Sequence, residues 1–562
     1  MQKKKGLVSE VGLERLAERN GFDCLREDYV GMDGHKMKTL VIAGSSTQLD
    51  IVLDNDIVQA VTLAFPGLSE PTATLMEPAG QILLNDLKLL PNQSPLTKTL
   101  DGFAANLERL ASLDQLSIVE AGFTCHEALA GMYTSLERVH QWDVVKLRED
   151  PALSGKSDQY LSLMAMCTRH GLPVMHAQGR VGLALQYWKE RRFLPPSNDQ
   201  ILSLVRKHEK VWSLAVECRP MPHIMLPPVR VSDAWISKEI VKDDGMGSDS
   251  QNLPLDWQEP EHAALASQDE GKTGRAIDMI QPDLTTRKVP PVKFTVTFDP
   301  PVVVTHADWV RLHNCVEVEA QPPLVYPPTF DVMHFPIQPG APHNPSELRI
   351  IARQRRVPVF DEEGKASEVH HRNTLFNYKR IYAMSVSELS FSHPKQLVAM
   401  LPILRQYAFI SILLQNSFGP GTEDSAAAAP SGSENGVQSG VAAQTVTEKD
   451  ELTAFLKPAG KRNGAEATTP APRLNEVNMD VSLWVHPNPL LKVVFPFKDC
   501  TANIEMYILE NGIVEIINEN ILEETESGKA KGRELTRRDL ARVLEHLEDL
   551  CKWIEWIRTR LS

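Results

Sequence analysis

The first part of the chain combines a helical and a strand-like spacing of hydrophobic residues. Residues 6–21 carry apolar side chains at helical intervals and end at Gly21, which predicts a helix that stops there. Short or alternating apolar runs then predict three strands, at residues 39–43, 48–53 and 57–65. A polar turn at residues 54–56 joins the last two strands, so we expect them to form a hairpin.

A block of helices follows, because apolar residues recur every three or four positions. The predicted helices span residues 72–90, 98–116, 123–144 and 157–169. Apolar residues then recur at every second position, as in a strand. Residues 180–188 and 210–217 are therefore predicted to be companion strands.

Proline-rich stretches separate the elements of the second half. Strands are predicted at residues 292–298, 302–305 and 379–391, followed by a helix at 394–415. Four further strands are predicted at residues 481–485, 491–497, 504–509 and 512–517. The pattern closes with one amphipathic helix, about residues 533–561, whose apolar stripe follows the helical period throughout.

Two polar segments interrupt this pattern, and each has a single aromatic residue, Trp257 in one and Phe455 in the other. Neither has enough apolar residues to offset the entropy of ordering, so we expect both to be disordered. The predicted fold class is α+β, with mixed helical and antiparallel-sheet blocks interrupted by two disordered insertions. The expected domains are an N-terminal α+β domain (1–240), an acidic flexible insertion (243–290), a middle α+β region (291–418), a low-complexity linker (419–478), and a C-terminal strand block with its amphipathic helix (479–562).

Composition refines this picture. The 562 residues are 42% hydrophobic and 23% charged, which indicates a globular protein of several domains. The formal net charge is −14, and the two insertions carry −6 and −3 of it. Such a balance argues against binding nucleic acid by bulk electrostatics, which needs clustered lysine and arginine. No run of about 18 apolar residues suggests a membrane span. Seven cysteines without a C-x-x-C pair favour a reducing compartment.

The sequence offers little catalytic chemistry. His370 and His371 are adjacent, so their side chains should point apart instead of sharing a metal ion. Cys125 and His126 are neighbours in a predicted helix and diverge for the same reason. The segment 44–46, Gly-Ser-Ser, lies between two strands and is interpreted as a turn. No phosphate-binding glycine loop and no nucleophile elbow occur. We therefore expect no enzyme activity, no cofactor and no metal, although an enzyme without a recognisable motif stays open as an alternative.

Features that suggest binding to a partner protein are stronger than those that suggest catalysis. Residues 447–450 form a helix-capping pattern inside the low-complexity linker, and apolar residues follow it. This short amphipathic helix could fold into a partner's groove, with Leu452, Phe455 and Leu456 as the contact residues. The C-terminal helix also carries Trp553 and Trp556, which pack either on their own domain or on another subunit.

Four stretches, in order, resemble subunit 1 of the Mediator coactivator complex, especially its fungal branch. They are Leu40-Val41-Ile42-Ala43-Gly44 with Leu49-Asp50-Ile51, Gly179-Arg180-Val181-Gly182-Leu183-Ala184-Leu185-Gln186-Tyr187-Trp188, Glu217-Cys218-Arg219-Pro220, and Pro227-Pro228-Val229-Arg230-Val231-Ser232-Asp233-Ala234-Trp235. The resemblance covers residues 7–391 well and the C-terminal block loosely.

The resemblance implies a non-enzymatic nuclear protein of the complex's middle module, which helps to bridge DNA-bound activators and RNA polymerase II. The implied partners are other Mediator subunits, activators and, indirectly, the polymerase, with no direct nucleic acid and no membrane. Animal members bind nuclear receptors through L-x-x-L-L boxes. Here only related segments occur, at 410–414 and 540–544, in helices that need those residues for packing. The alternative is an interaction scaffold of another assembly, such as a trafficking or chromatin adaptor.

Overall fold

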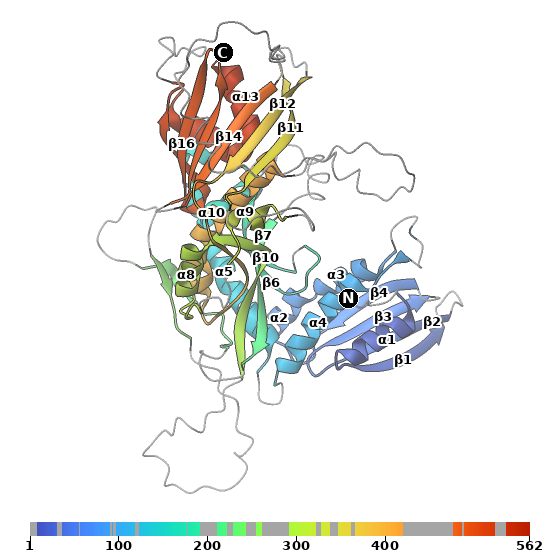
Figure 1. The fold of residues 1–562 in the computed structure, drawn as a ribbon. Helices are drawn as coiled ribbons and strands as arrows, with labels where there is room; N and C mark the ends of the chain where they lie inside the picture. The colour runs from blue at the N-terminus through green and yellow to red at the C-terminus, as the bar shows by residue number, and fades with distance from the viewer. Residues whose placement is uncertain are drawn as a thin grey trace, which may run out of the picture.

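In the residues that it describes, the computed structural model has four β-sheets with helices packed around them. Figure 1 shows the sheets at different levels of the molecule, with the chain's last strands at the top. The structure describes residues 8–30, 36–54, 57–89, 93, 97–118, 123–176, 178–190, 211–221, 229–242, 254–260, 291–321, 327–337, 347–360, 366–419, 476–485, 488–522 and 535–561. Helices and sheets are both abundant in these residues, which confirms the α+β class.

The N-terminal unit is an antiparallel meander with helices packed against it. Its elements are α1 (Glu10–Arg19), β1 (Asp23–Val30), β2 (Lys36–Ala43), β3 (Gln48–Asp54), β4 (Ile57–Ala64), α2 (Glu70–Met76), α3 (Ala79–Leu87) and α4 (Asp101–Leu116). The expected hairpin is present, with Asp54 opposite Ile57. Strand β1 was not predicted, because this charged edge strand lacks an alternating apolar pattern. The single helix expected at 72–90 is two helices, which Pro78 separates.

A second antiparallel sheet has the order β13-β10-β7-β6-β5. Its strands are β5 (Leu172–Met175), β6 (Leu183–Lys189), β7 (Val211–Pro220), β10 (Val292–Thr305) and β13 (Ala383–Phe391). Helices α5 (Cys125–Arg148) and α6 (Asp158–Thr168) pack on this sheet. The two strands expected at 292–298 and 302–305 are one long strand whose register shifts on the β13 side. Because β7 pairs with β10, this sheet crosses the domain boundary expected near residue 240.

The largest sheet has the order β11-β12-β14-β15-β16-β17. Its strands are β11 (Ile350–Phe360), β12 (Ala366–Phe376), β14 (Glu476–Trp484), β15 (Leu490–Phe497), β16 (Cys500–Leu509) and β17 (Ile513–Glu519). Strands β12 and β14 are parallel, with His370 opposite Glu476, so the middle region and the C-terminal strands share one sheet instead of forming separate blocks. The hairpin β11–β12 was missed because arginine and histidine interrupt its apolar pattern.

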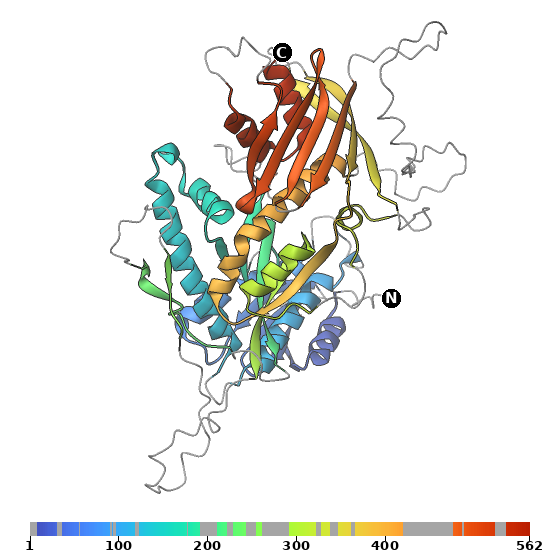
Figure 2. The same ribbon diagram turned by 60° about the vertical axis from the view of Figure 1, so that its left-hand side comes forward.

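Helix α10 (Pro394–Phe418) lies between the two larger sheets and contacts strands of both (Figure 2). It agrees closely with the helix predicted at 394–415. By length and composition this helix could cross a membrane, but 83% of its most apolar 18-residue stretch is buried inside the fold. An apolar helix that is buried on most of its sides is typical of the core of a folded protein.

The C-terminal end differs from prediction. The expected continuous helix is two helices, α12 (Arg537–Leu547) and α13 (Leu550–Arg560). Glu548 adopts a left-handed conformation with φ of 50°, and the Asp549 side chain accepts hydrogen bonds from the amides of Cys551 and Lys552 in the first turn of α13. The remaining elements are β8 (Ile236–Val241), β9 (Leu255–Trp257), α8 (His306–Cys315), α9 (Phe330–His334), and short 3-10 turns at Pro151–Leu153 and Glu510–Gly512.

Candidate functional site

Part of the expected acidic insertion is ordered. Strand β9 lies within its first third and pairs antiparallel with β8, so that Trp257 is opposite Ile236. The next residue, Gln258, donates its amide to the carbonyl of Trp235 at 2.9 Å. The structure thus differs here from the flexible segment expected at 243–290. The remaining residues of that prediction, 243–253 and 261–290, lie outside the described residues.

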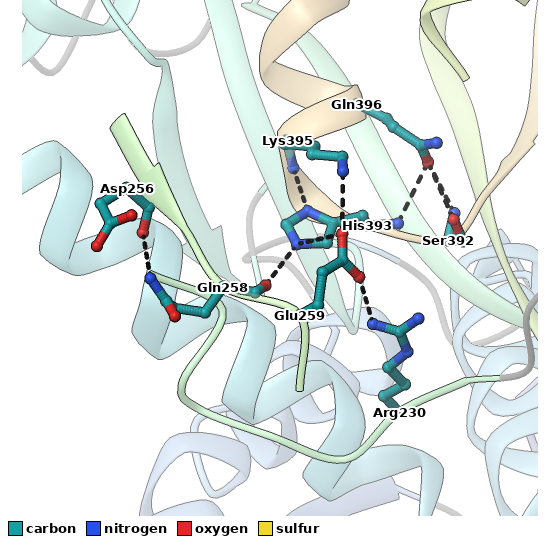
Figure 3. Close-up of polar contacts among 8 residues, drawn as sticks. All are labelled: Arg230, Asp256, Gln258, Glu259, Ser392, His393, Lys395 and Gln396. Carbon is teal, nitrogen blue, oxygen red and sulfur yellow. Dashed lines mark hydrogen bonds and ion pairs between the residues drawn. The ribbon is translucent and has the colours of Figure 1, made fainter. Parts of the chain in front are cut away.

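Glu259 fastens this segment to the rest of the fold (Figure 3). Its carboxylate accepts hydrogen bonds from the Arg230 guanidinium at 2.6 Å and from the Lys395 ammonium at 3.0 Å. The Nε2 atom of His393 lies 3.9 Å from the same carboxylate. Burial alone would raise the pKa of Glu259, but these bonds to Arg230 and Lys395 outweigh it and lower the pKa to about 2. Glu259 is therefore a carboxylate at neutral pH.

His393 connects the segment to the start of α10. Its Nδ1 accepts a hydrogen bond from the amide of Lys395 at 2.9 Å, which caps the helix. Its Nε2 donates to the carbonyl of Gln258 at 2.8 Å. One ring nitrogen accepts and the other donates, so the imidazole is neutral. Burial lowers the pKa of His393, an effect that the Gln258 carbonyl and Glu259 partly offset.

Two tryptophans enclose the same histidine. The ring of Trp235 lies 5.0 Å from the His393 ring, and that of Trp257 lies 5.6 Å from it, both edge-on. Arg230 lies over Trp235 at 5.9 Å. We call the contact of residues 254–260 with residues 229–236 and 392–396 the clasp. It joins part of the insertion, the segment that leads into β8 and the first turn of the central helix.

Most of the clasp could not be predicted from the sequence pattern. Arg230, Glu259, His393 and Lys395 were not singled out, because they come from three distant segments. The available signal was Trp257, the single aromatic residue of an otherwise polar segment, since a large apolar ring in such a segment needs a surface to cover it.

The predicted contact residues have different outcomes. Leu452, Phe455 and Leu456 lie outside the described residues, so their role stays a prediction. Trp553 is fully buried, and its indole N–H donates to the carbonyl of Leu540 at 3.0 Å, which ties α13 to α12. Trp556 is half-buried and packs against the same core. Both tryptophans thus contact their own domain, and their role in binding a partner stays a prediction.

The histidine pair behaves as its spacing predicts. His370 is exposed, whereas His371 is fully buried and its Nε2 lies 2.8 Å from the Glu555 carboxylate on α13. Burial alone would raise the pKa of Glu555, but His371 and Arg558 outweigh it and lower that pKa. In the part of the chain that the structure describes, no group of three or more histidine, cysteine, aspartate or glutamate side chains could hold a metal ion.

The Gly-Ser-Ser segment is a turn, as interpreted from the sequence. Asp114 on α4 accepts hydrogen bonds from the amides of Ser45 and Ser46, at 2.8 and 2.6 Å, and from both hydroxyls. Burial alone would raise the pKa of Asp114, but these bonds lower it. A Cβ at Gly44 would lie 2.4 Å from an Asp114 oxygen, so only glycine fits. Neighbouring Cys125 and His126 are both buried, and the hydrogen bonds of the two serines to Asp114 hold the β2–β3 turn.

The two segments related to receptor-binding boxes are packed inside the fold. Ile410, Leu413 and Leu414 of α10 are each at most 1% exposed. Leu540 and Leu544 of α12 are fully buried. Their predicted use in packing is confirmed.

The fold and the clasp define the class of the protein: a large α+β protein, built around a buried central helix, on which part of an acidic insertion docks. The sequence model of a known family, Mediator of RNA polymerase II transcription subunit 1, matches residues 1–419. The chain belongs to this family, as the ordered motifs of the first 391 residues suggested. Comparison with curated proteins found no match. Family membership implies a role in transcription as a Mediator subunit, associated with other subunits of that nuclear complex.

Proposed function

We propose that this protein is a non-enzymatic subunit of the middle module of Mediator and helps to bridge DNA-bound regulators and RNA polymerase II in the nucleus. The family match over residues 1–419 is the observation that carries the proposal. The matched region contains the N-terminal unit, the whole five-stranded sheet and α10. The physical mechanism is docking: the ordered sheets hold a place in the assembly, and the insertions, apart from the docked residues 254–260, contact partners.

Affinity purification of the tagged full chain from nuclear extract, followed by mass spectrometry, tests this proposal. We expect other Mediator subunits to co-purify, with those of the middle module most abundant. Recovery of a trafficking or chromatin complex without Mediator subunits would support the alternative scaffold and overturn the proposal. Imaging of the tagged chain should place it in the nucleus, and exclusion from the nucleus would contradict the assignment.

We also propose that the capped segment at residues 447–456 binds a partner. The support is its capping pattern and its three apolar residues, Leu452, Phe455 and Leu456. Replacing Leu452 and Phe455 with alanine should reduce the recovery of at least one co-purifying protein. Replacing Thr468 and Thr469 with alanine in the same linker is the control. Equal recovery of every co-purifying protein with the wild type, the Leu452 and Phe455 variant and the control variant would contradict this proposal.

A further inference from the structure

A small pocket lies where the N-terminal unit meets the five-stranded sheet. Helix α4, helix α5, the residues before β6 and strand β7 line it, and its volume is about 220 Å³. Its apolar lining residues are Ala105, Leu113, Leu129, Val181, Val216 and Cys218. Small-molecule sites usually have volumes of roughly 300–1,000 Å³, so this pocket suits one or two side chains of a larger ligand.

Three arginines of this pocket converge on one carboxylate. Arg219 donates to Glu217 at 2.8 Å, Arg180 also donates to it, and the Nε atom of Arg109 lies 3.9 Å from it. We call this group the arginine pocket. Glu108 is the other charged lining residue, so the lining carries a net charge of +1. Each guanidinium has about five N–H donors, whereas one carboxylate accepts about four hydrogen bonds, so donors are in excess.

The arginines remain partly accessible. Their side chains are 29%, 21% and 46% exposed for Arg109, Arg180 and Arg219. Burial lowers the pKa of Arg109 and the neighbouring Arg180 lowers it further, although Glu217 and Asp299 oppose this. A further carboxylate placed here would therefore be attracted to a site that already holds closely spaced positive charges.

We propose that the arginine pocket binds an acidic, apolar peptide segment of a partner protein, with a carboxylate on the arginines and an apolar side chain against Ala105, the apolar lining residue that is not buried. Glu217 is then an internal competitor for the same guanidinium groups. Charge complementarity selects an acidic ligand, and the apolar lining selects a peptide over a nucleic acid. The inference deepens the proposed function by naming the chemistry of a partner, and it rests on that function only for the partner's biological setting.

Fluorescence anisotropy with the purified full chain tests the proposal. The probe is a fluorescein-labelled synthetic peptide, Asp-Asp-Phe-Asp-Leu-Asp-Asp. Arg180→Gln and Arg219→Gln should each weaken binding by up to about 5-fold, as expected for partly exposed charge pairs. Arg148→Gln should leave binding unchanged, because Arg148 pairs with Asp158 away from the pocket. Circular dichroism and thermal unfolding confirm that each variant is folded.

The Glu217→Gln variant separates ligand binding from a structural role. If Glu217 competes with the ligand, its removal should tighten binding of the peptide about 3-fold or more, since the same arginines become available. If the arginines serve only to hold Glu217, this variant should bind no better than the wild type, and that result would overturn the proposal. If Arg180→Gln does not fold, Arg219→Gln still decides, because Arg219 is the most exposed of the three.

Three further results would also overturn it. They are no binding of the acidic peptide by the wild type, equal binding of a peptide with lysine at every aspartate position, and equal binding of a single-stranded oligonucleotide of the same charge. Weaker binding when alanine replaces the phenylalanine and leucine of the probe would support the apolar contact. Because the assay contains no other subunit, its failure leaves the co-purification result, and thus the proposed function, intact.

Discussion

At the scale of single residues, hydrogen-bonded carboxylates and a glycine determine the conformation of turns and segments that the hydrophobic pattern does not predict. Asp114 holds a turn 68 residues away in sequence, and Glu259 holds a segment that composition alone assigns to disorder. Both act through hydrogen bonds to charged oxygens, which are stronger than those between neutral groups. Each contact can be tested by a substitution that leaves the surrounding core unchanged.

Gly44→Ala should destabilise the protein by about 1–3 kcal/mol, because the added methyl group overlaps Asp114 and forces the turn to shift. Chemical denaturation monitored by circular dichroism measures the change. Gly80→Ala in α3 is the matched control: its Cβ would have only ordinary contacts, and alanine favours a helix. Equal stability of the Gly44 variant and the wild type would contradict the packing described here.

Glu259→Gln should loosen the clasp, since the charge that pairs with Arg230 and Lys395 is lost. The side chain is 58% exposed, so we expect a loss of at most about 1 kcal/mol and faster hydrogen exchange at residues 254–260. Glu239→Gln on the paired strand β8 should change exchange little. Unaltered exchange in the Glu259 variant would show that the tryptophan contacts alone hold the segment.

At the scale of elements, local patterns predicted most helices and core strands, and tertiary contacts determined the rest. The apolar stripe of 533–561 continues through Leu547 and Leu550, so nothing in its spacing reveals the turn at Glu548. Strands β1, β11 and β12 were missed, because charged and polar residues interrupt any alternation of apolar residues in them. The clasp was missed for a related reason, since Glu259, Arg230 and His393 meet only in the folded chain. The elements that could be predicted are determined by residues close in the sequence. Those that could not be predicted depend on contacts between residues that are distant in the sequence.

Helix α10 shows how one polar residue can join several elements. Arg405 is 1% exposed and donates to the carbonyls of Tyr187, Met166 and Arg169 and to the side chain of Asn511. Two of those carbonyls lie at the C-terminal end of α6, where positive charge is favourable. The arginine thus ties α10, α6, β6 and the turn before β17 together.

Arg405→Met should lower the free energy of unfolding by at least about 2 kcal/mol, because buried carbonyl groups lose their donors. Thermal or urea denaturation measures the loss. Arg311→Met is the matched control, since Arg311 is 51% exposed and pairs with Asp308 and Glu510 near the surface. A variant as stable as the control would mean that water or a rearranged side chain replaces those donors.

At the scale of the whole molecule, histidines buried in a neutral state make the fold sensitive to acid. Burial lowers the pKa of His126, His176 and His334 to about 4, although the Asp114 charge opposes this at His126. The unfolded chain binds more protons than the native one between pH 6.5 and 4. Stability should therefore fall as the pH drops through this window, by up to about 1.4 kcal/mol per pH unit for each histidine.

Scanning calorimetry from pH 7.5 to pH 5 measures this dependence as a falling Tm. His334→Phe should flatten the curve, because it removes one titrating group and keeps an aromatic ring beside Phe330. The same substitution at exposed His370 should leave the slope unchanged. A Tm that stays constant over the whole range would contradict the neutral burial of these histidines.

The parallel pairing of β12 with β14 also bears on how the molecule can be divided. The family match ends at residue 419, directly after α10, but the sheet over that helix needs strands from residue 476 onward. A fragment cut at 419 would leave β12 as an open edge and α10 without its cover from α13, and open edges recruit other chains. The limit of sequence similarity is therefore not a limit of folding, and a fragment meant to stay monomeric has to include residues 476–561.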